Sequence, residues 1–235
     1  MHTVKIADWA IQQTLLRRGT RHVHDNIDPR KTALVVVDMQ NGFCVEEVAA
    51  AYVPYAVETI PAINRLASAV RRTGGKAFFL KQTVDAESAV AWSEWLGMMT
   101  PDTRQRLMTN LVPGSRGHEL HSDLDVKAED EIVLKTRFSG FVQGSSDLPQ
   151  RLRQQGYDTV LITGTVTNVC CESSARDAMM LNFKTIMVSD ANSTRTDEEH
   201  NATLSTFLAI FGDVMDTDYL IGRLEAGAAV RVAAE

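Results

Sequence analysis

Long apolar runs, clustered charge and internal repeats are all missing from this sequence. Its longest apolar runs have the length of a strand, so none predicts a membrane span. The 24 basic and 30 acidic residues give a net charge of −6 and are scattered, which argues against a nucleic-acid or anionic-lipid surface. The first residues lack the continuous apolar core of a secretory signal. We therefore predict a cytoplasmic protein whose partners include neither nucleic acid nor a membrane.

Cysteine is also scarce, with three residues at Cys44, Cys170 and Cys171. They are too few for a disulfide framework, and they lack the paired C-x-x-C spacing of a zinc site. At least one cysteine is therefore available for chemistry. Linker-like tracts rich in Pro, Ser or Gly are absent as well, so residues 1–235 predict a single domain that buries about 70% of its unfolded surface.

Strand-length apolar runs alternate with segments of helical period along the chain. Strands are expected at 33–37, 77–80, 132–134, 159–163, 185–188 and 214–215. Helices are expected at 3–17, 59–72, 147–155, 169–181 and 196–211. This alternation predicts the α/β class: a three-layer αβα fold with a doubly wound, six-stranded parallel sheet of Rossmann-like type.

Two segments stand apart from this pattern. Residues 84–121 fit neither period well, and we interpret them as helical turns and loops that form a lid-like insertion over one end of the sheet. The N-terminal helix 3–17 lies before the core. It is expected either to serve an oligomer interface or to dock on its own sheet.

Three reactive side chains are placed at the carboxyl ends of predicted strands. Asp38 follows the first strand, Lys135 follows the third, and the Cys170–Cys171 pair opens the helix after the fourth. Each alone is more often a turn former, a solvated cation or a small buried residue, but the carboxyl ends of parallel strands meet at one edge. An ammonium about 4 Å from a thiol would lower its pKa by nominally about three units before desolvation is subtracted. We therefore predict that one thiol of this pair is a nucleophile activated by Lys135, with Asp38 as the acceptor of its proton.

Three motifs around these residues match a known family. Asp-Met-Gln-Asn-Gly-Phe begins at Asp38, Val-Leu-Lys-Thr-Arg-Phe-Ser-Gly-Phe contains Lys135, and Gly-Thr-Val-Thr-Asn-Val-Cys-Cys-Glu-Ser-Ser-Ala-Arg-Asp-Ala contains Cys170. Over roughly residues 31–220 the sequence resembles the isochorismatase-like cysteine hydrolase superfamily, in its N-carbamoylsarcosine amidase and ureidoacrylate hydrolase-like branch. The resemblance implies an αβα fold, a catalytic triad of Asp38, Lys135 and Cys170, and a homodimer or homotetramer.

The resemblance also implies a non-proline cis peptide at Thr165–Val166. This bond would direct the backbone N–H of Val166, together with that of Cys170, at a developing oxyanion. Metal-binding nicotinamidases of the superfamily hold their ion through an Asp-x-His pair and a further His, but this sequence has no histidine between Asp25 and Gly117. We therefore predict no metal and no cofactor, and we interpret His118 and His121 as surface residues.

A thiol nucleophile favours hydrolysis of a small amide or N-carbamoyl (ureido) substrate through a covalent acyl-cysteine, with release of ammonia or an amine. The alternative within the family is vinyl ether hydrolysis of the isochorismatase type, although proteins of that branch tend to carry glycine at the position of Cys170. The alternative from another class is a thiol redox protein that uses Cys170 and Cys171, or a binding protein without activity.

Substrate contacts are expected from side chains near the three motifs. Four aromatic rings would wall the pocket: Phe43, Trp92, Trp95 and Phe138. Hydrogen bonds to the substrate are expected from Gln40 and from Asn41 or Thr167. Arg137 is a candidate partner for an anionic group. Phe138 stands where ureidoacrylate hydrolases tend to carry tyrosine, and Cys44 is expected to pack near Phe43 without a chemical role.

Overall fold

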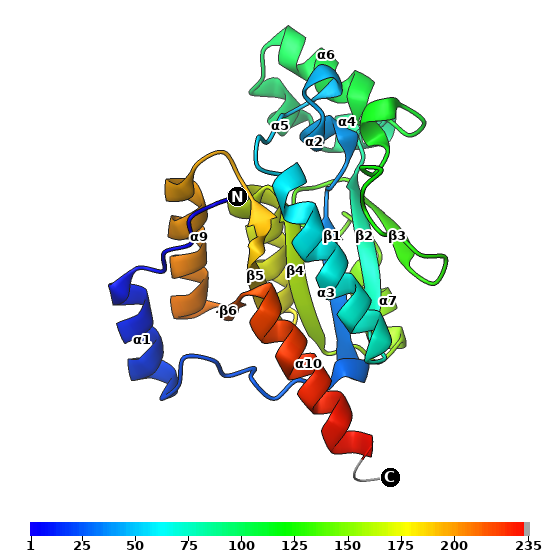
Figure 1. The fold of residues 1–235 in the computed structure, drawn as a ribbon. Helices are drawn as coiled ribbons and strands as arrows, with labels where there is room; N and C mark the ends of the chain where they lie inside the picture. Colours follow the sequence, from blue (N-terminus) through cyan, green and yellow to red (C-terminus); the bar gives the residue numbers. More distant parts are fainter. Residues whose placement is uncertain (233–235) are drawn as a thin grey trace.

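The computed structural model describes residues 1–232 and has a parallel sheet at its centre (Figure 1). The strand order is β3–β2–β1–β4–β5–β6. The strands are β1 (Thr32–Val37), β2 (Lys76–Gln82), β3 (Glu131–Lys135), β4 (Thr159–Thr165), β5 (Lys184–Ser193) and β6 (Asp213–Met215). The order reverses beside β1, as in a doubly wound sheet. The predicted fold class and six strands are confirmed.

Helices cover both faces of the sheet and complete the three layers (Figure 1). One face carries α3 (Ile60–Arg72) and α10 (Thr217–Val232), and the other carries α7 (Leu148–Gln154), α8 (Glu172–Met180) and α9 (Asp197–Ile210). Each face of the sheet packs against its helices in a separate hydrophobic core. Successive β1 side chains point into these two cores alternately, with Leu34 and Val36 on the α3 side and Val35 on the α8 side. Every residue of β1 is buried, as a central parallel strand requires.

The first helix is shorter than predicted. It is α1 (Asp8–Arg18), and residues 1–7 lie extended along α9. The backbone N–H of Lys5 donates to Asn201 Oδ1 at 2.7 Å, and that of Ala7 donates to Ser205 Oγ at 3.0 Å. Side chains of α9 thus satisfy two backbone donors, of which the N–H of Ala7 would have bonded internally in a helix beginning at residue 3. The chain then packs α1 on α9 rather than on the sheet.

Strand β5 runs five residues beyond its predicted end. The prediction stopped at residue 188 because the polar residues 189 and 190 interrupt the apolar run there. The sheet accommodates them through Asn192, whose Nδ2 donates to Ile162 O at 2.8 Å and Val188 O at 2.7 Å. The predicted helix 169–181 is likewise divided into a π-type turn at Thr167–Cys171 and α8. Both differences from the prediction lie at the carboxyl edge of the sheet, where polar residues follow the strands.

Residues 84–121 lie over that carboxyl edge (Figure 1). They form α4 (Ala86–Ala91), α5 (Ser93–Gly97), α6 (Pro101–Asn110) and a 3-10 turn at Arg116–His118. The short α2 (Asn41–Cys44) packs beneath them, and further 3-10 turns occupy Pro29–Lys31, Glu46–Val48 and Val57–Thr59. Within residues 1–232, no helix combines the length and the apolar character needed to cross a membrane.

Gly164 of β4 pairs with Val37 of β1 beside this edge. It has φ +109°, and an added Cβ would lie 2.1 Å from the carbonyl oxygen of Val37. We predict that Gly164→Ala lowers the free energy of unfolding in urea by about 3 kcal/mol, because it adds a steric clash to left-handed backbone strain. Gly144→Ala is the matched control, since Gly144 has φ +79° with no atom within 4 Å. That variant should lose only about 1 kcal/mol; equal losses would refute the clash.

Candidate active site

The three predicted catalytic residues meet at the carboxyl edge of the sheet, beneath residues 84–121. Cys170 lines a pocket of about 160 Å³ there, and Asp38 and Lys135 lie behind it with 0% exposure. Asp38 directly follows β1 and adopts φ +52°, a left-handed conformation that is uncommon outside glycine. Its backbone N–H donates to Leu80 O of β2 at 3.1 Å, which holds the turn in place.

Lys135 forms a buried ion pair with Asp38. Its Nζ lies 2.8 Å from Asp38 Oδ2 and donates to Gln82 Oε1 at 2.7 Å and to Arg137 O at 3.0 Å. Asp38 supplies the opposite charge, and Gln82 and Arg137 supply two hydrogen-bond acceptors for the ammonium. The position and charge of Lys135 are therefore fixed without any contact to water.

The Cys170 thiol lies beside the Asp38 carboxylate, and each group shifts the pKa of the other. The backbone N–H of Val166 faces the same sulfur, and Thr165–Val166 is a cis peptide, as the resemblance implied. Cys171 is directed elsewhere, because its Sγ lies 3.9 Å from Thr163 O inside the protein. Of the two adjacent cysteines, the pocket is lined by Cys170.

Burial raises the pKa of the Cys170 thiol to about 12; the Lys135 ammonium lowers it, but the Asp38 charge opposes that effect. Lys135 therefore acts on the thiol pKa in the predicted direction, but burial outweighs it in the resting protein. Burial also raises the pKa of Asp38, and Lys135 offsets part of that rise. Burial alone would lower the pKa of Lys135, but the charges of Asp38 and Cys170 outweigh it and the net direction is upward. The resting site is thus a neutral thiol beside an ion pair whose carboxylate is a stronger base than an exposed aspartate.

The predicted aromatic wall is largely present. Phe43, Trp95 and Phe138 line the pocket. Trp92 lies outside the lining and stacks on Trp95 with ring centroids 4.2 Å apart. Cys44 is buried in the same core cluster as Phe43, as expected.

The predicted polar contacts are used for structure. Gln40 is fully buried: its Nε2 donates to Gln82 O and His118 O, both at 3.1 Å, and its Oε1 accepts from the Gln82 N–H at 2.7 Å. The proposed role of Gln40 in substrate binding is therefore wrong, because its amide is already occupied by the backbone.

Three other predicted polar side chains also have protein partners. Buried Thr167 shares a hydrogen bond of 2.9 Å with His200 Nδ1. Asn41 Nδ2 donates to a backbone carbonyl of the 3-10 turn at Arg116–His118 at 3.0 Å. Arg137 donates to Ala91 O of α4 at 3.2 Å, with its guanidinium 5.3 Å from the centre of the Trp92 ring. None of these three side chains lies in the pocket lining.

Polar residues that the sequence analysis missed take their place. The pocket is lined by Gln82, Asn168, Thr194, Arg195 and Glu199. Gln82 ends β2, and Thr194 and Arg195 directly follow β5, so the strand-end argument that found Asp38 applies to them too. They were missed because the predicted strands ended too early.

His118 is buried rather than exposed, and its Nε2 shares a hydrogen bond of 2.9 Å with Thr83 Oγ1. Burial lowers its pKa to about 4. The surface interpretation of His118 is therefore wrong, and the side chain of His121 is only 13% exposed. Residues 1–232 contain no group of three or more His, Cys, Asp or Glu side chains that could hold a metal ion.

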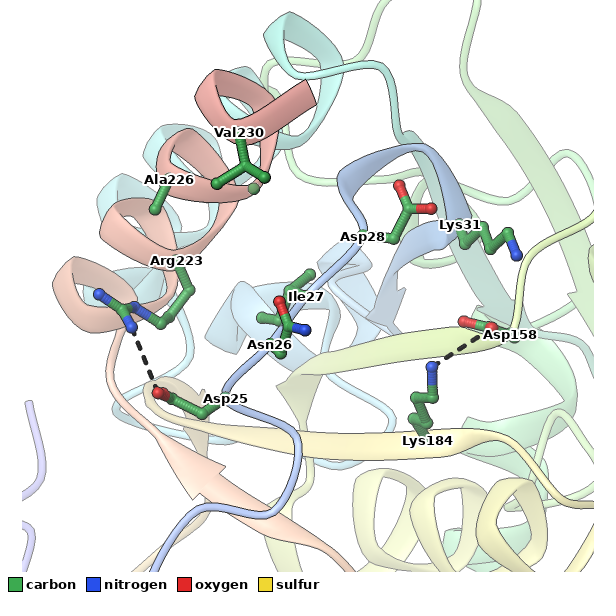
Figure 2. A pocket seen from close by; sticks show the side chains of 11 residues that line it. Asp25, Asn26, Ile27, Asp28, Lys31, Asp158, Lys184, Arg223, Ala226 and Val230 are labelled. Carbon is green, nitrogen blue, oxygen red and sulfur yellow. Dashed lines mark hydrogen bonds and ion pairs between the residues drawn. The ribbon is translucent and has the colours of Figure 1, made fainter. Parts of the chain in front are cut away.

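A second cavity, of about 660 Å³, lies at the opposite end of the molecule, between α10 and the amino ends of the strands (Figure 2). Its charged side chains are mixed in sign and partly paired. Arg223 contacts Asp25 at 3.2 Å, and Lys184 contacts Asp158 at 3.4 Å (Figure 2). None of the predicted catalytic residues lines this cavity.

Comparison with known proteins assigns the chain to a family. The model of the Isochorismatase domain matches residues 32–219, which include β1 to β6 and all three predicted catalytic residues. The chain belongs to the isochorismatase family of hydrolases. The resemblance inferred from the three motifs is therefore confirmed.

Relatives within the isochorismatase family include amidohydrolases. The chain is 31% identical over 211 residues to ureidoacrylate amidohydrolase RutB of Serratia proteamaculans, covering 84% of each chain. Among solved structures, it resembles a cysteine hydrolase from Pseudomonas syringae pv. phaseolicola with TM-score 0.76 and 31% identity, over 86% of this chain and 96% of that chain. N-carbamoylsarcosine amidase from Thermoplasma acidophilum matches with TM-score 0.64 and 26% identity, over 80% and 97% respectively.

The burial of Cys170 predicts that its thiol is alkylated slowly at neutral pH. Because its pKa is about 12, its alkylation rate with iodoacetamide should keep rising with pH beyond about pH 10, without a plateau near the usual thiol pKa of about 8.5. The rate is measured by mass spectrometry of the peptide that contains Cys170, with Cys170→Ser as the blank. A plateau reached between about pH 7 and 9 would contradict the burial of an uncharged thiol.

Proposed function

We propose that this protein is a cysteine-dependent amidohydrolase that cleaves a non-peptide C–N bond of a small amide or N-carbamoyl substrate. The observation that carries the proposal is the buried Lys135–Asp38 ion pair, with the Cys170 thiol beside it at the wall of a pocket. The names of the relatives, ureidoacrylate amidohydrolase and N-carbamoylsarcosine amidase, support a ureido substrate.

In the first step, the Cys170 sulfur attacks the carbonyl carbon while Asp38 accepts the thiol proton. The two events are coupled, because the buried site disfavours a free thiolate. Lys135 keeps Asp38 ionised until the proton arrives. The backbone N–H groups of Val166 and Cys170 are expected to stabilise the oxyanion of the tetrahedral intermediate.

In the second step, Asp38 returns the proton to the departing nitrogen as the C–N bond breaks, which releases ammonia or an amine and leaves an acyl-cysteine. A water molecule then attacks the acyl carbon and gives its proton to Asp38. The C–S bond breaks, and the sulfur recovers the proton from Asp38. One water is consumed, and both residues return to their starting protonation states.

The polar wall of the pocket suits a ureido acid. Arg195 is exposed, lines the pocket and has no hydrogen bond or ion pair with the rest of residues 1–232. Its guanidinium is available for a substrate carboxylate, in place of the predicted Arg137. Glu199 lies on the same wall and could accept a ureido N–H. We infer that residues 84–121 act as a lid that keeps bulk water from this pocket.

Cys170→Ala should abolish ammonia release in a screen over ureido acids and primary amides, by at least about a thousandfold, because the nucleophile is lost. Cys171→Ala is the matched control, since its thiol is buried outside the pocket lining and it should keep most of the activity. The expected intermediate is an acyl adduct on Cys170, detected by mass spectrometry after rapid acid quenching. Full activity in Cys170→Ala, or an adduct on Cys171, would overturn the proposal.

Arg195→Gln should raise KM for a carboxylate-bearing ureido substrate by about tenfold and leave kcat nearly unchanged, because it removes a charge-assisted contact remote from the reacting bond. A neutral ureido analogue of the same length should be hydrolysed equally by both proteins. Arg116→Gln serves as the control for loss of an exposed arginine outside the lining. An equal KM for the acid in Arg195→Gln and wild type would exclude this carboxylate site.

A further inference from the structure

The side-chain amide of Gln82, a residue that lines the catalytic pocket, has hydrogen-bond donors that no group in the described part of the protein uses. Gln82 is 3% exposed and lines the pocket together with Cys170. Its Nε2 has no hydrogen-bond partner within residues 1–232. A buried donor without an acceptor is uncommon in native proteins. In a side chain that lines a pocket, it indicates a donor whose acceptor is a ligand or water.

The orientation of this amide is fixed by its neighbours. Its Oε1 accepts from Lys135 Nζ at 2.7 Å, and an ammonium offers only donors, so the oxygen and not the nitrogen must face Lys135. The backbone of Gln82 is held on both sides by Gln40, which accepts from its N–H and donates to its carbonyl oxygen. Nε2 is therefore held as a donor on the side of the amide away from Lys135.

We propose that Gln82 Nε2 binds the carbonyl oxygen of the scissile amide or carbamoyl group, which makes Gln82 a catalytic residue. Nε2 can only donate, so its partner is an acceptor, and the acceptor of the reacting group is its carbonyl oxygen. Gln82 contacts Lys135, which contacts Asp38, so this donor belongs to the reacting centre rather than to the distant end of the substrate that Arg195 would hold. The inference rests on the proposed function, because it assigns a role in that reaction.

Lys135 strengthens this donor. Its ammonium polarises the Gln82 amide through Oε1, and hydrogen bonds linked in this way reinforce one another in a buried site. As negative charge develops on the carbonyl oxygen, the bond from Nε2 becomes stronger than in the ground state. Lys135 thus acts on both ends of the reaction: on the proton acceptor through Asp38, and on the oxygen through Gln82.

Two substitutions separate donation to the substrate from support of Lys135. Gln82→Met has a similar length but neither donor nor acceptor, while Gln82→Glu keeps an acceptor for Lys135 and loses the donor. Both should lower kcat by about a hundredfold at neutral pH, as expected for loss of one oxyanion donor. Gln82→Glu should recover as the pH falls and its carboxyl gains a donating proton. Turnover by Gln82→Glu equal to wild type at neutral pH would overturn the inference, because support of Lys135 would then suffice.

A reactivity test that needs no substrate distinguishes failure of this inference from failure of the proposed function. Iodoacetamide presents an amide carbonyl to the pocket, whereas allyl bromide alkylates thiols without one. Gln82→Met should slow alkylation of Cys170 by iodoacetamide about tenfold, the value of one hydrogen bond, and leave the allyl bromide rate unchanged. The control is Gln154→Met, an exposed substitution on α7.

Equal slowing with both reagents, or no slowing with either, would overturn the role of Gln82 as a carbonyl donor. Selective slowing in a protein that releases no ammonia from any amide or ureido substrate would retain that role and reject the proposed function. Thermal unfolding of all variants checks that the rates compare folded proteins.

Discussion

The buried ion pair between Lys135 and Asp38 is the interaction on which the rest of the site depends. Two opposite charges lie 2.8 Å apart with no exposed surface, so loss of either would leave an uncompensated charge, which costs about 3–5 kcal/mol. The strand order supplies the pair and its partners: Asp38 follows β1, Gln82 ends the neighbouring β2, and Lys135 ends β3 opposite Gln82. Three adjacent parallel strands therefore deliver an acid, an amide and an ammonium to one edge.

In the proposed reaction, this arrangement allows a thiol of high pKa to act as the nucleophile. Burial opposes the thiolate, but it also raises the pKa of Asp38 and so makes the neighbouring carboxylate a better acceptor of the thiol proton. The negative charge is then transferred from the carboxylate to the reacting substrate in a site whose dipoles are already oriented. A neutral resting thiol is also protected from oxidation, since oxidants attack the thiolate. The proposed mechanism therefore relies on proton transfer within the substrate complex and not on a permanently reactive sulfur.

Much of this could be predicted from sequence, for reasons that particular residues make clear. The unbroken apolar run of β1 indicated the parallel sheet. The polar residues at the carboxyl ends of β1, β3 and β4 located the candidate site, because strand ends in a parallel sheet share an edge. The occupation of Gln40 by the backbone of Gln82 could not be predicted, since it depends on a contact between residues 42 positions apart. The extended path of residues 1–7 likewise depends on side chains of α9 nearly 200 positions away. The net pKa of Cys170 depends on how completely the surrounding elements exclude water, which spacing along the chain does not encode.

The most direct test of the central claim is the protonation state of the resting site, read by infrared difference spectroscopy. Spectra of wild type minus Asp38→Asn and wild type minus Cys170→Ser, taken at neutral pH without substrate, isolate the two groups. The buried ion pair predicts an ionised carboxylate band for Asp38 together with an S–H stretching band for Cys170. A protonated carboxyl band for Asp38, or the absence of the Cys170 S–H band, would contradict it.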